Sequence, residues 1–226
     1  FKNHLGLLQY LRLLCTDPQR YGLSAFKPEP LGAYRAKAPK LDWLLDRLKR
    51  IRADDEKAII FCEFRNIQRL LQYYIEQEFK VRPDIINGDT SAASGHSASR
   101  QKRIKAFQEH PGFMVIILSP LAVGFGVNIQ AANHVIHYTR TWNPAKEDQA
   151  TDRAYRIGQK KPVYVYYPVV TADDFSTFDV KLDQLLTKKR EWAADMLNGS
   201  GDLAPGDFEI ADVIPGGNLE DIQENV

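Results

Sequence analysis

The chain has 226 residues, of which 44% are hydrophobic and 26% are charged, proportions that are typical of a globular protein. No apolar run reaches the roughly 18 residues that span a bilayer, and no signal-peptide pattern is found at the start of these residues. Cys15 and Cys62 are too few for a disulfide framework or a metal centre, which favours a reducing cytoplasmic setting and predicts no metal site. Because the first residue is Phe1 and not Met, we expect a fragment of a longer protein.

The charge is distributed unevenly along the chain. Residues 198–226 hold seven acids and neither Lys nor Arg, whereas the net charge of the whole chain is only +1. Without these seven acids, residues 1–197 carry +8. A positive body is compatible with a phosphate-backbone partner, although solubility alone explains such a charge equally well. We expect the acidic, Gly-rich tail to be poorly ordered.

Helical and strand-like patterns alternate along the chain. Apolar residues at helical spacing predict helices over 4–15 and 41–51, separated by a Pro-rich linker. The pattern then predicts strands at 58–61, 83–86, 113–118, 135–138 and 163–169, and helices at 67–79, 99–108, from residue 144, and at 175–196. Such alternation indicates an α/β fold, a parallel sheet with helices on both faces. Ligands of these sheets bind at the carboxyl ends of the strands.

The segment 149–159 gathers cationic side chains on one predicted helix face. In a helix that begins at Pro144, residues Gln149, Arg153 and Arg156 fall at positions i, i+4 and i+7. Two guanidinium groups on one face match the geometry of a phosphate ligand. The alternative is a solvated helix face whose arginines pair with nearby acids.

Two further segments bear on phosphate binding. Gly124 and Gly126 follow the strand predicted at 113–118 and allow a backbone to approach a ligand closely, although a tight strand-to-helix turn needs the same glycines. The acids at 54–56 precede a strand instead of ending one, so we interpret them as a charged turn and not as magnesium ligands. No G-x-x-x-x-G-K-[ST] sequence occurs in the chain, so the usual phosphate-cradling loop is absent from these residues.

Together these segments resemble the conserved motifs of the C-terminal RecA-like lobe of Swi/Snf-type helicase-like ATPases, in helicase superfamily two. The similar segments are 57–64 (motif IV), 86–90 with Arg100 and Phe107, 118–129 (motif V), and 142–144 with 149–159 (motif VI, "WNP…QAxxRxxRxGQ"). The helices around 8–15 and 181–190 resemble those that brace this lobe. The implied domains are an N-terminal helix and linker at 1–39, the RecA-like lobe at 40–170, a bracing helix at 171–197 and an acidic tail at 198–226.

The resemblance implies a role for each matching residue. Arg153 and Arg156 would be arginine fingers, positioned by Gln149. The other implied contacts are Gly124, Gly126 and Asn128 along the ATP cleft, and Thr90, Arg100, Ser119 and Trp142 on the backbone of double-stranded DNA. Trp142 is equally suited to be a core aromatic residue. ATP and Mg²⁺ would be held mainly by the N-terminal RecA-like lobe, so we expect this chain alone to be inactive as an ATPase.

Several positions depart from the family pattern. Leu121 stands where a basic residue is usual, Arg140 where an aspartate is usual, and Tyr155 where a histidine is usual. These departures resemble prokaryotic members, some of which belong to antiphage defence systems of the Zorya or DISARM type, and a cytoplasmic or nucleoid-associated location is expected. An RNA helicase lobe, which the Gly158-Gln159 ending disfavours, and a non-enzymatic nucleic-acid-binding module remain alternatives.

Other conspicuous side chains have simpler interpretations. Lys188, Lys189 and Arg190 are interpreted as a solvated helix face. His134 and His137 have no evident ligand partners nearby in sequence, so we interpret both as structural.

Overall fold

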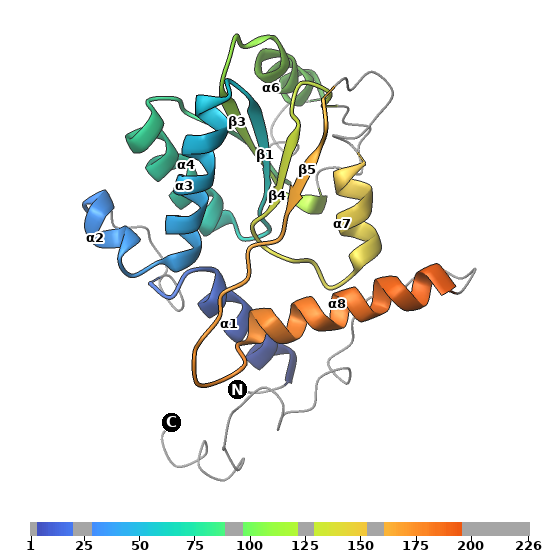
Figure 1. Ribbon diagram of the computed structural model, residues 1–226. Coiled ribbons are helices and arrows are strands. Elements are labelled where there is room, and N and C mark those ends of the chain that lie inside the picture. Colours follow the sequence, from blue (N-terminus) through green and yellow to red (C-terminus); the bar gives the residue numbers. More distant parts are fainter. Residues whose placement is uncertain (1–3, 20–28, 89–96, 122–128, 153–160, 196–226) are drawn as a thin grey trace.

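A five-stranded parallel sheet forms the centre of the computed structural model, which describes residues 4–19, 29–88, 97–121, 129–152 and 161–195 (Figure 1). The strand order is β2-β3-β1-β4-β5, and every neighbouring pair runs parallel. The strands are β1 (Lys57–Phe61), β2 (Asp84–Ile86), β3 (Met114–Leu118), β4 (His134–His137) and β5 (Tyr164–Tyr166). This arrangement confirms the α/β fold that the alternating pattern predicted.

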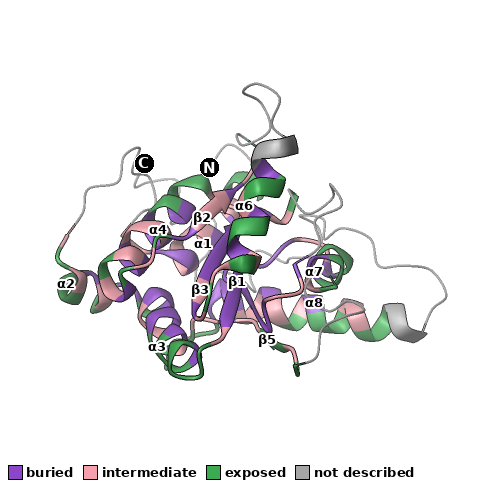
Figure 2. Cartoon of the chain, turned by 90° about the horizontal axis from the view of Figure 1, so that it is seen from above, coloured by how far each residue is buried: buried purple, intermediate pink, exposed green. Residues whose placement is uncertain are grey.

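Helices cover both faces of the sheet. Helices α3 (Pro39–Ala53) and α4 (Arg65–Phe79) pack on one face, and α6 (Ser97–Glu109) and α7 (Pro144–Thr151) pack on the other. Successive residues of a strand alternate between the two hydrophobic clusters, so Ile60 faces α3 and α4 whereas its neighbour Ile59 faces α6 and α7. The central strands are therefore apolar on both sides, and Figure 2 shows them buried among helices whose outer faces are exposed.

Two further helices, α1 (His4–Thr16) and α8 (Phe178–Asp195), pack together at the carboxyl edge of the sheet. Leu8 of α1 is buried against three residues of α8, Phe178, Leu182 and Leu186. The buried guanidinium of Arg12 donates to Glu63, just after β1, and to the carbonyl oxygen of Arg140, just after β4. These contacts attach the helix pair to the sheet and confirm the predicted bracing helices.

The predicted linker contains a short helix, α2 (Leu31–Arg35), that the sequence pattern did not indicate. It buries Tyr34, whose hydroxyl donates to the carboxylate of Asp17 over 2.6 Å. A five-residue helix is too short to show a helical period, and the prolines around it were typical of a linker.

Two element boundaries also differ from the prediction. Strand β5 is shorter than 163–169, because Pro168 has no N–H with which to continue the ladder. Helix α8 begins at Phe178 and not at Phe175, because Thr177 accepts a hydrogen bond from the N–H of Val180 at the first turn.

The acidic segment 54–56 is a turn between α3 and β1, as predicted. Asp55 adopts a left-handed backbone with φ of 55°, and its carboxylate accepts a hydrogen bond from the N–H of Phe113 over 3.1 Å. Gly112 beside it has φ of +73°. These residues therefore fix the junction between α3, β1 and β3, at the amino end of the sheet.

Within the described segments, none of the helices is both long enough and apolar enough to cross a membrane.

Candidate functional site

The structure describes four of the ten residues assigned to the site from the sequence, which are Gln149, Arg100, Ser119 and Trp142. The other six lie outside the described residues, namely Thr90, Gly124, Gly126, Asn128, Arg153 and Arg156. The described part of the site is therefore the carboxyl edge of β3 and β4 together with helix α7.

Helix α7 begins where the sequence predicted. The side chain of Asn143 caps it by accepting a hydrogen bond from the N–H of Ala145 over 2.9 Å, and Pro144 occupies the first helical position. The helix buries Glu147 and leaves Gln149 exposed. It ends at Thr151, so the proposed phosphate-facing arginines follow within a few residues of its last described turn.

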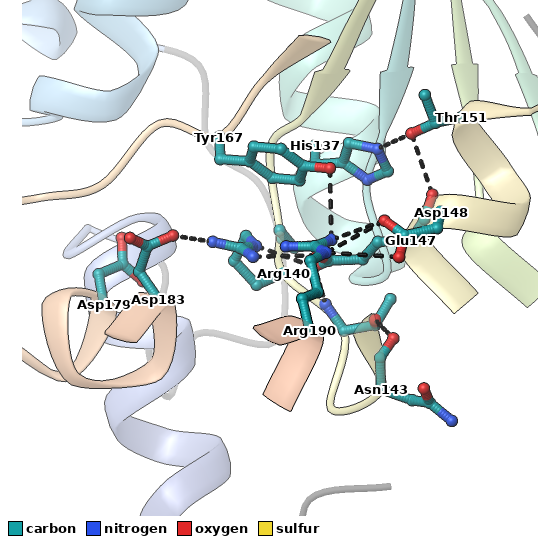
Figure 3. Close-up of polar contacts among 12 residues, drawn as sticks. His137, Arg140, Asn143, Glu147, Asp148, Thr151, Tyr167, Asp179, Asp183 and Arg190 are labelled. Atoms are coloured by element: carbon teal, nitrogen blue, oxygen red, sulfur yellow. Dashed lines mark hydrogen bonds and ion pairs between the residues drawn. The ribbon is translucent and has the colours of Figure 1, made fainter. Parts of the chain in front are cut away.

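A buried carboxylate holds the first turns of α7 in place. Glu147 is fully buried, and its two oxygens accept from Nε and Nη2 of Arg140 over 2.9 and 3.0 Å. It also accepts from the N–H of Thr141 over 2.8 Å and from Nη2 of Arg190 over 2.8 Å (Figure 3). The side chain of Glu147 therefore joins α7 to the segment that follows β4 and to α8.

Arg140 is the cation at the centre of this network, although the family pattern usually has an aspartate there. Besides Glu147, it donates to Asp183 of α8, and its guanidinium lies 4.3 Å from the centre of the Tyr167 ring. Burial by itself would lower the pKa of Arg140, but the hydrogen bonds with Glu147 and the charge of Asp183 raise it above its ordinary value. The arginine therefore stays charged inside the lobe.

The interpretation of Arg190 as part of a solvated face is wrong. Its guanidinium donates to Glu147, to Asp148 over 3.0 Å and to the hydroxyl of Tyr167 over 3.4 Å. A signal for this burial exists in the sequence, because Arg190 continues the helical stripe of Leu182 and Leu186 at intervals of four residues. Lys188 lies off that stripe and is exposed, as predicted.

Both histidines of β4 are buried structural residues, as predicted. Nε2 of His134 lies 2.6 Å from Glu56, and Nε2 of His137 lies 2.9 Å from the hydroxyl of Thr151 at the end of α7. Burial, helped by the charges of Arg140 and Arg190, lowers the pKa of His137 to about 3. His137 is therefore neutral and connects β4 to the last turn of α7.

The three described candidates for DNA contact have different surroundings. Trp142 is half-buried. The centre of its ring lies 6.2 Å from that of Phe178 in an edge-to-face arrangement and 5.2 Å from the guanidinium carbon of Arg12, so the ring packs on the α1 and α8 cluster. Ser119 is 7% exposed and its N–H donates to Ile86 over 2.9 Å. Arg100 is 8% exposed on α6.

Next to Ser119, at the end of β3, Leu121 is 73% exposed. A solvent-facing leucine thus occupies the position at which the family usually has a basic residue.

In the part of the chain that the structure describes, no group of three or more His, Cys, Asp or Glu side chains is arranged to hold a metal ion. Burial raises the pKa of the Cys62 thiol to about 12 and also raises that of Cys15. Both cysteines are therefore protonated thiols at neutral pH and contribute packing.

These features define the class of the chain. Residues 39–158 match the family described as "Helicase conserved C-terminal domain", and the chain belongs to this family as the C-terminal RecA-like lobe of a Snf2-type ATPase. In line with this, the solved Sulfolobus solfataricus SWI2/SNF2 ATPase C-terminal domain superposes with a TM-score of 0.64 and 25% identity, over 95% of this chain and 82% of that one.

Among known proteins, the chain is 55% identical to the Zorya protein ZorD of Escherichia coli O139:H28 (strain E24377A / ETEC) over 206 residues, which are 91% of this chain. It is 36% identical over 188 residues, 82% of its length, to YwqA of Bacillus subtilis (strain 168), which is named as a candidate ATP-dependent helicase/translocase. The matched region is 18% of ZorD and 19% of YwqA, so this chain spans less than a fifth of either relative.

Proposed function

We propose that this chain is the second motor lobe of an ATP-driven double-stranded DNA translocase that acts in an antiphage defence system of the Zorya type. The observation that carries the proposal is the placement of α7. This helix begins just after the carboxyl end of β4, at the edge of the sheet where α/β folds bind ligands, and the two arginines of the motif VI segment follow it in the sequence. The 55% identity with ZorD supports the defence context.

On the ATP side, we assign Arg153 and Arg156 as arginine fingers. Gln149 is exposed on α7 and stands four residues before Arg153 in the sequence, and we assign it to position that arginine, as the motif implies. Gly124, Gly126 and Asn128 would line the same cleft. When bound, ATP with Mg²⁺ supplies the phosphoanhydride bond whose cleavage drives movement, and the N-terminal RecA-like lobe of the complete protein would hold most of it.

On the DNA side, we assign Thr90, Ser119 and Trp142 to the phosphate backbone. Ser119 follows β3 and Trp142 follows β4. Because the two strands are parallel, both residues lie beyond the same carboxyl edge of the sheet. Trp142 packs against the α1 and α8 cluster but is only half-buried, so part of this residue is accessible for contact with DNA. Arg100 is the weakest of the four assignments, because only 8% of this residue is exposed.

The test is the ATPase rate of the complete protein with duplex DNA, single-stranded DNA, RNA or no nucleic acid. We expect duplex DNA to stimulate turnover most strongly. Arg156→Ala should reduce the stimulated rate by a factor of about 10³, in line with arginine fingers of other phosphoryl-transfer enzymes. Lys188→Gln removes a positive charge from exposed α8 surface and should leave the rate unchanged.

Other outcomes would replace this proposal. Stronger stimulation by RNA would identify an RNA helicase lobe, and binding of nucleic acid without any turnover would identify a non-enzymatic module. We also expect residues 1–226 alone to show no ATPase activity, since they lack a phosphate-cradling loop. Robust turnover by the isolated chain that Arg156→Ala abolishes would contradict the division of the site between two lobes.

A further inference from the structure

Helix α8 contacts α7 through a series of ion pairs in which acidic and basic side chains alternate. Asp183 of α8 binds Arg140, Arg140 binds Glu147 of α7, and Glu147 binds Arg190 of α8, which also binds Asp148 of α7 (Figure 3). Asp183 and Arg190 are seven positions apart and so lie on one face of α8, from which Asp183 reaches Arg140 and Arg190 reaches α7. The contact is therefore specific in orientation and not a general attraction between charged surfaces.

The same helix α7 is also fixed at its other end. The hydroxyl of Thr151 lies 2.9 Å from Nε2 of His137 in β4, and Thr151 stands four residues after Glu147, on the same helix face. Thr151 therefore joins α7 to strand β4, and Glu147 joins it to the segment that follows β4 and to α8. Together they set the rotation of α7 about its axis, with Gln149 facing outward.

Arg190 can be lost without leaving a bare buried charge. Its side chain is 27% exposed, and Glu147 would keep its two hydrogen bonds from Arg140 and the one from Thr141. Asp148 is 52% exposed and would be solvated. The fold should therefore survive the removal of Arg190, while α7 loses its two ion pairs with Arg190 of α8.

We propose that Arg190 is a positioning residue, which reaches from the bracing helix α8 to hold α7 in the orientation that presents the arginines of the ATP site. This inference rests on the proposed function, since it assigns α7 the task of placing Arg153 and Arg156. The position of α8 thereby becomes a determinant of turnover, although α8 lies outside the sheet and carries none of the assigned site residues.

The experiment compares Arg190→Gln, Arg190→Lys and Lys188→Gln in the complete protein at saturating duplex DNA. Arg190→Gln and Lys188→Gln remove the same charge from the same helix, and only the first removes a contact with α7. We expect Arg190→Gln to lower kcat by about tenfold with less than about a twofold change in the KM for ATP, because misplacement affects the transition state more than substrate binding. Arg190→Lys should recover part of the loss, and Lys188→Gln should behave as the wild type.

Hydrogen exchange of the α7 amides provides a readout that does not depend on turnover. Exchange over residues 145–151 should be faster in Arg190→Gln and unchanged in Lys188→Gln. A wild-type kcat in Arg190→Gln, an equal loss in Lys188→Gln, or unchanged α7 exchange in Arg190→Gln would each overturn the proposal. If the wild-type protein has no stimulated ATPase activity, the proposed function fails, whereas the exchange data still decide whether Arg190 holds α7.

Discussion

The carboxylate of Glu147 gives the sharpest test of the network around α7. Glu147→Gln retains the size of the side chain but removes the charge that Arg140 and Arg190 share. It also turns an amide N–H₂ group toward one of their guanidinium donors. Breaking a buried ion pair from one side costs about 3–5 kcal/mol, and the lower end applies here because Arg140 keeps Asp183. For a domain of this size, about 3 kcal/mol corresponds to a fall in Tm of about 6–12 °C.

The assay is urea and thermal unfolding of the purified chain, followed by far-ultraviolet circular dichroism. Asp148→Asn is the matched control, because it makes the same chemical change one residue later on the same helix. The side chain of Asp148 is 52% exposed, whereas that of Glu147 is 0% exposed, so the control should cost less than about 1 kcal/mol. If Glu147→Gln destabilises the chain no more than Asp148→Asn does, the buried network contributes nothing specific and our reasoning is refuted.

Three other predictions follow from single residues. Burial lowers the pKa of His137 from an ordinary 6.5 to about 3 in the folded chain, so the unfolded chain takes up the proton first as the pH falls. The free energy of unfolding should therefore decrease from pH 6.5 down to pH 3, by up to about 1.4 kcal/mol per pH unit. His137→Phe should flatten that slope in unfolding measurements, and an unchanged slope would contradict the prediction. Gly112→Ala should cost about 1–3 kcal/mol, because φ is +73° and the added carbon would lie 2.5 Å from Oδ1 of Asp55, whereas Gly32→Ala meets no atom within 4 Å and should be tolerated. In the complete protein, Leu121→Lys should steepen the logarithmic salt dependence of duplex DNA binding by about 0.9, and a slope equal to that of Leu121→Gln would argue against DNA contact there.

The fold was predictable because its signals are local. Apolar runs marked all five strands, helical periods marked the long helices, and Pro144 marked the start of α7. The alternation of strands and helices implied a parallel sheet. The short helix α2 was missed, since five residues cannot display a period.

The polar network of the site could not be predicted in the same way. Arg140 and Arg190 are 50 residues apart, and nothing in the composition of either segment indicates which acid each one meets. The helical spacing of Leu182 and Leu186 sets Arg190 apart from Lys188, but it does not identify Glu147 and Asp148 as the partners of Arg190. The assignments of Arg153 and Arg156 rest on the motif and stay predictions, because both residues lie outside the described segments.

The packing of α1 against α8 has a consequence for how this lobe is made and handled. The two helices come from opposite ends of the described chain, yet Leu8 is buried in a cluster whose other buried members all belong to α8. During synthesis, the apolar face of α1 stays uncovered until the whole sheet and then α8 have been made. This surface is therefore exposed to solvent for a long time. A truncation that keeps only residues 40–170 would remove both helices and expose the carboxyl edge, so the unit to express is at least 4–195.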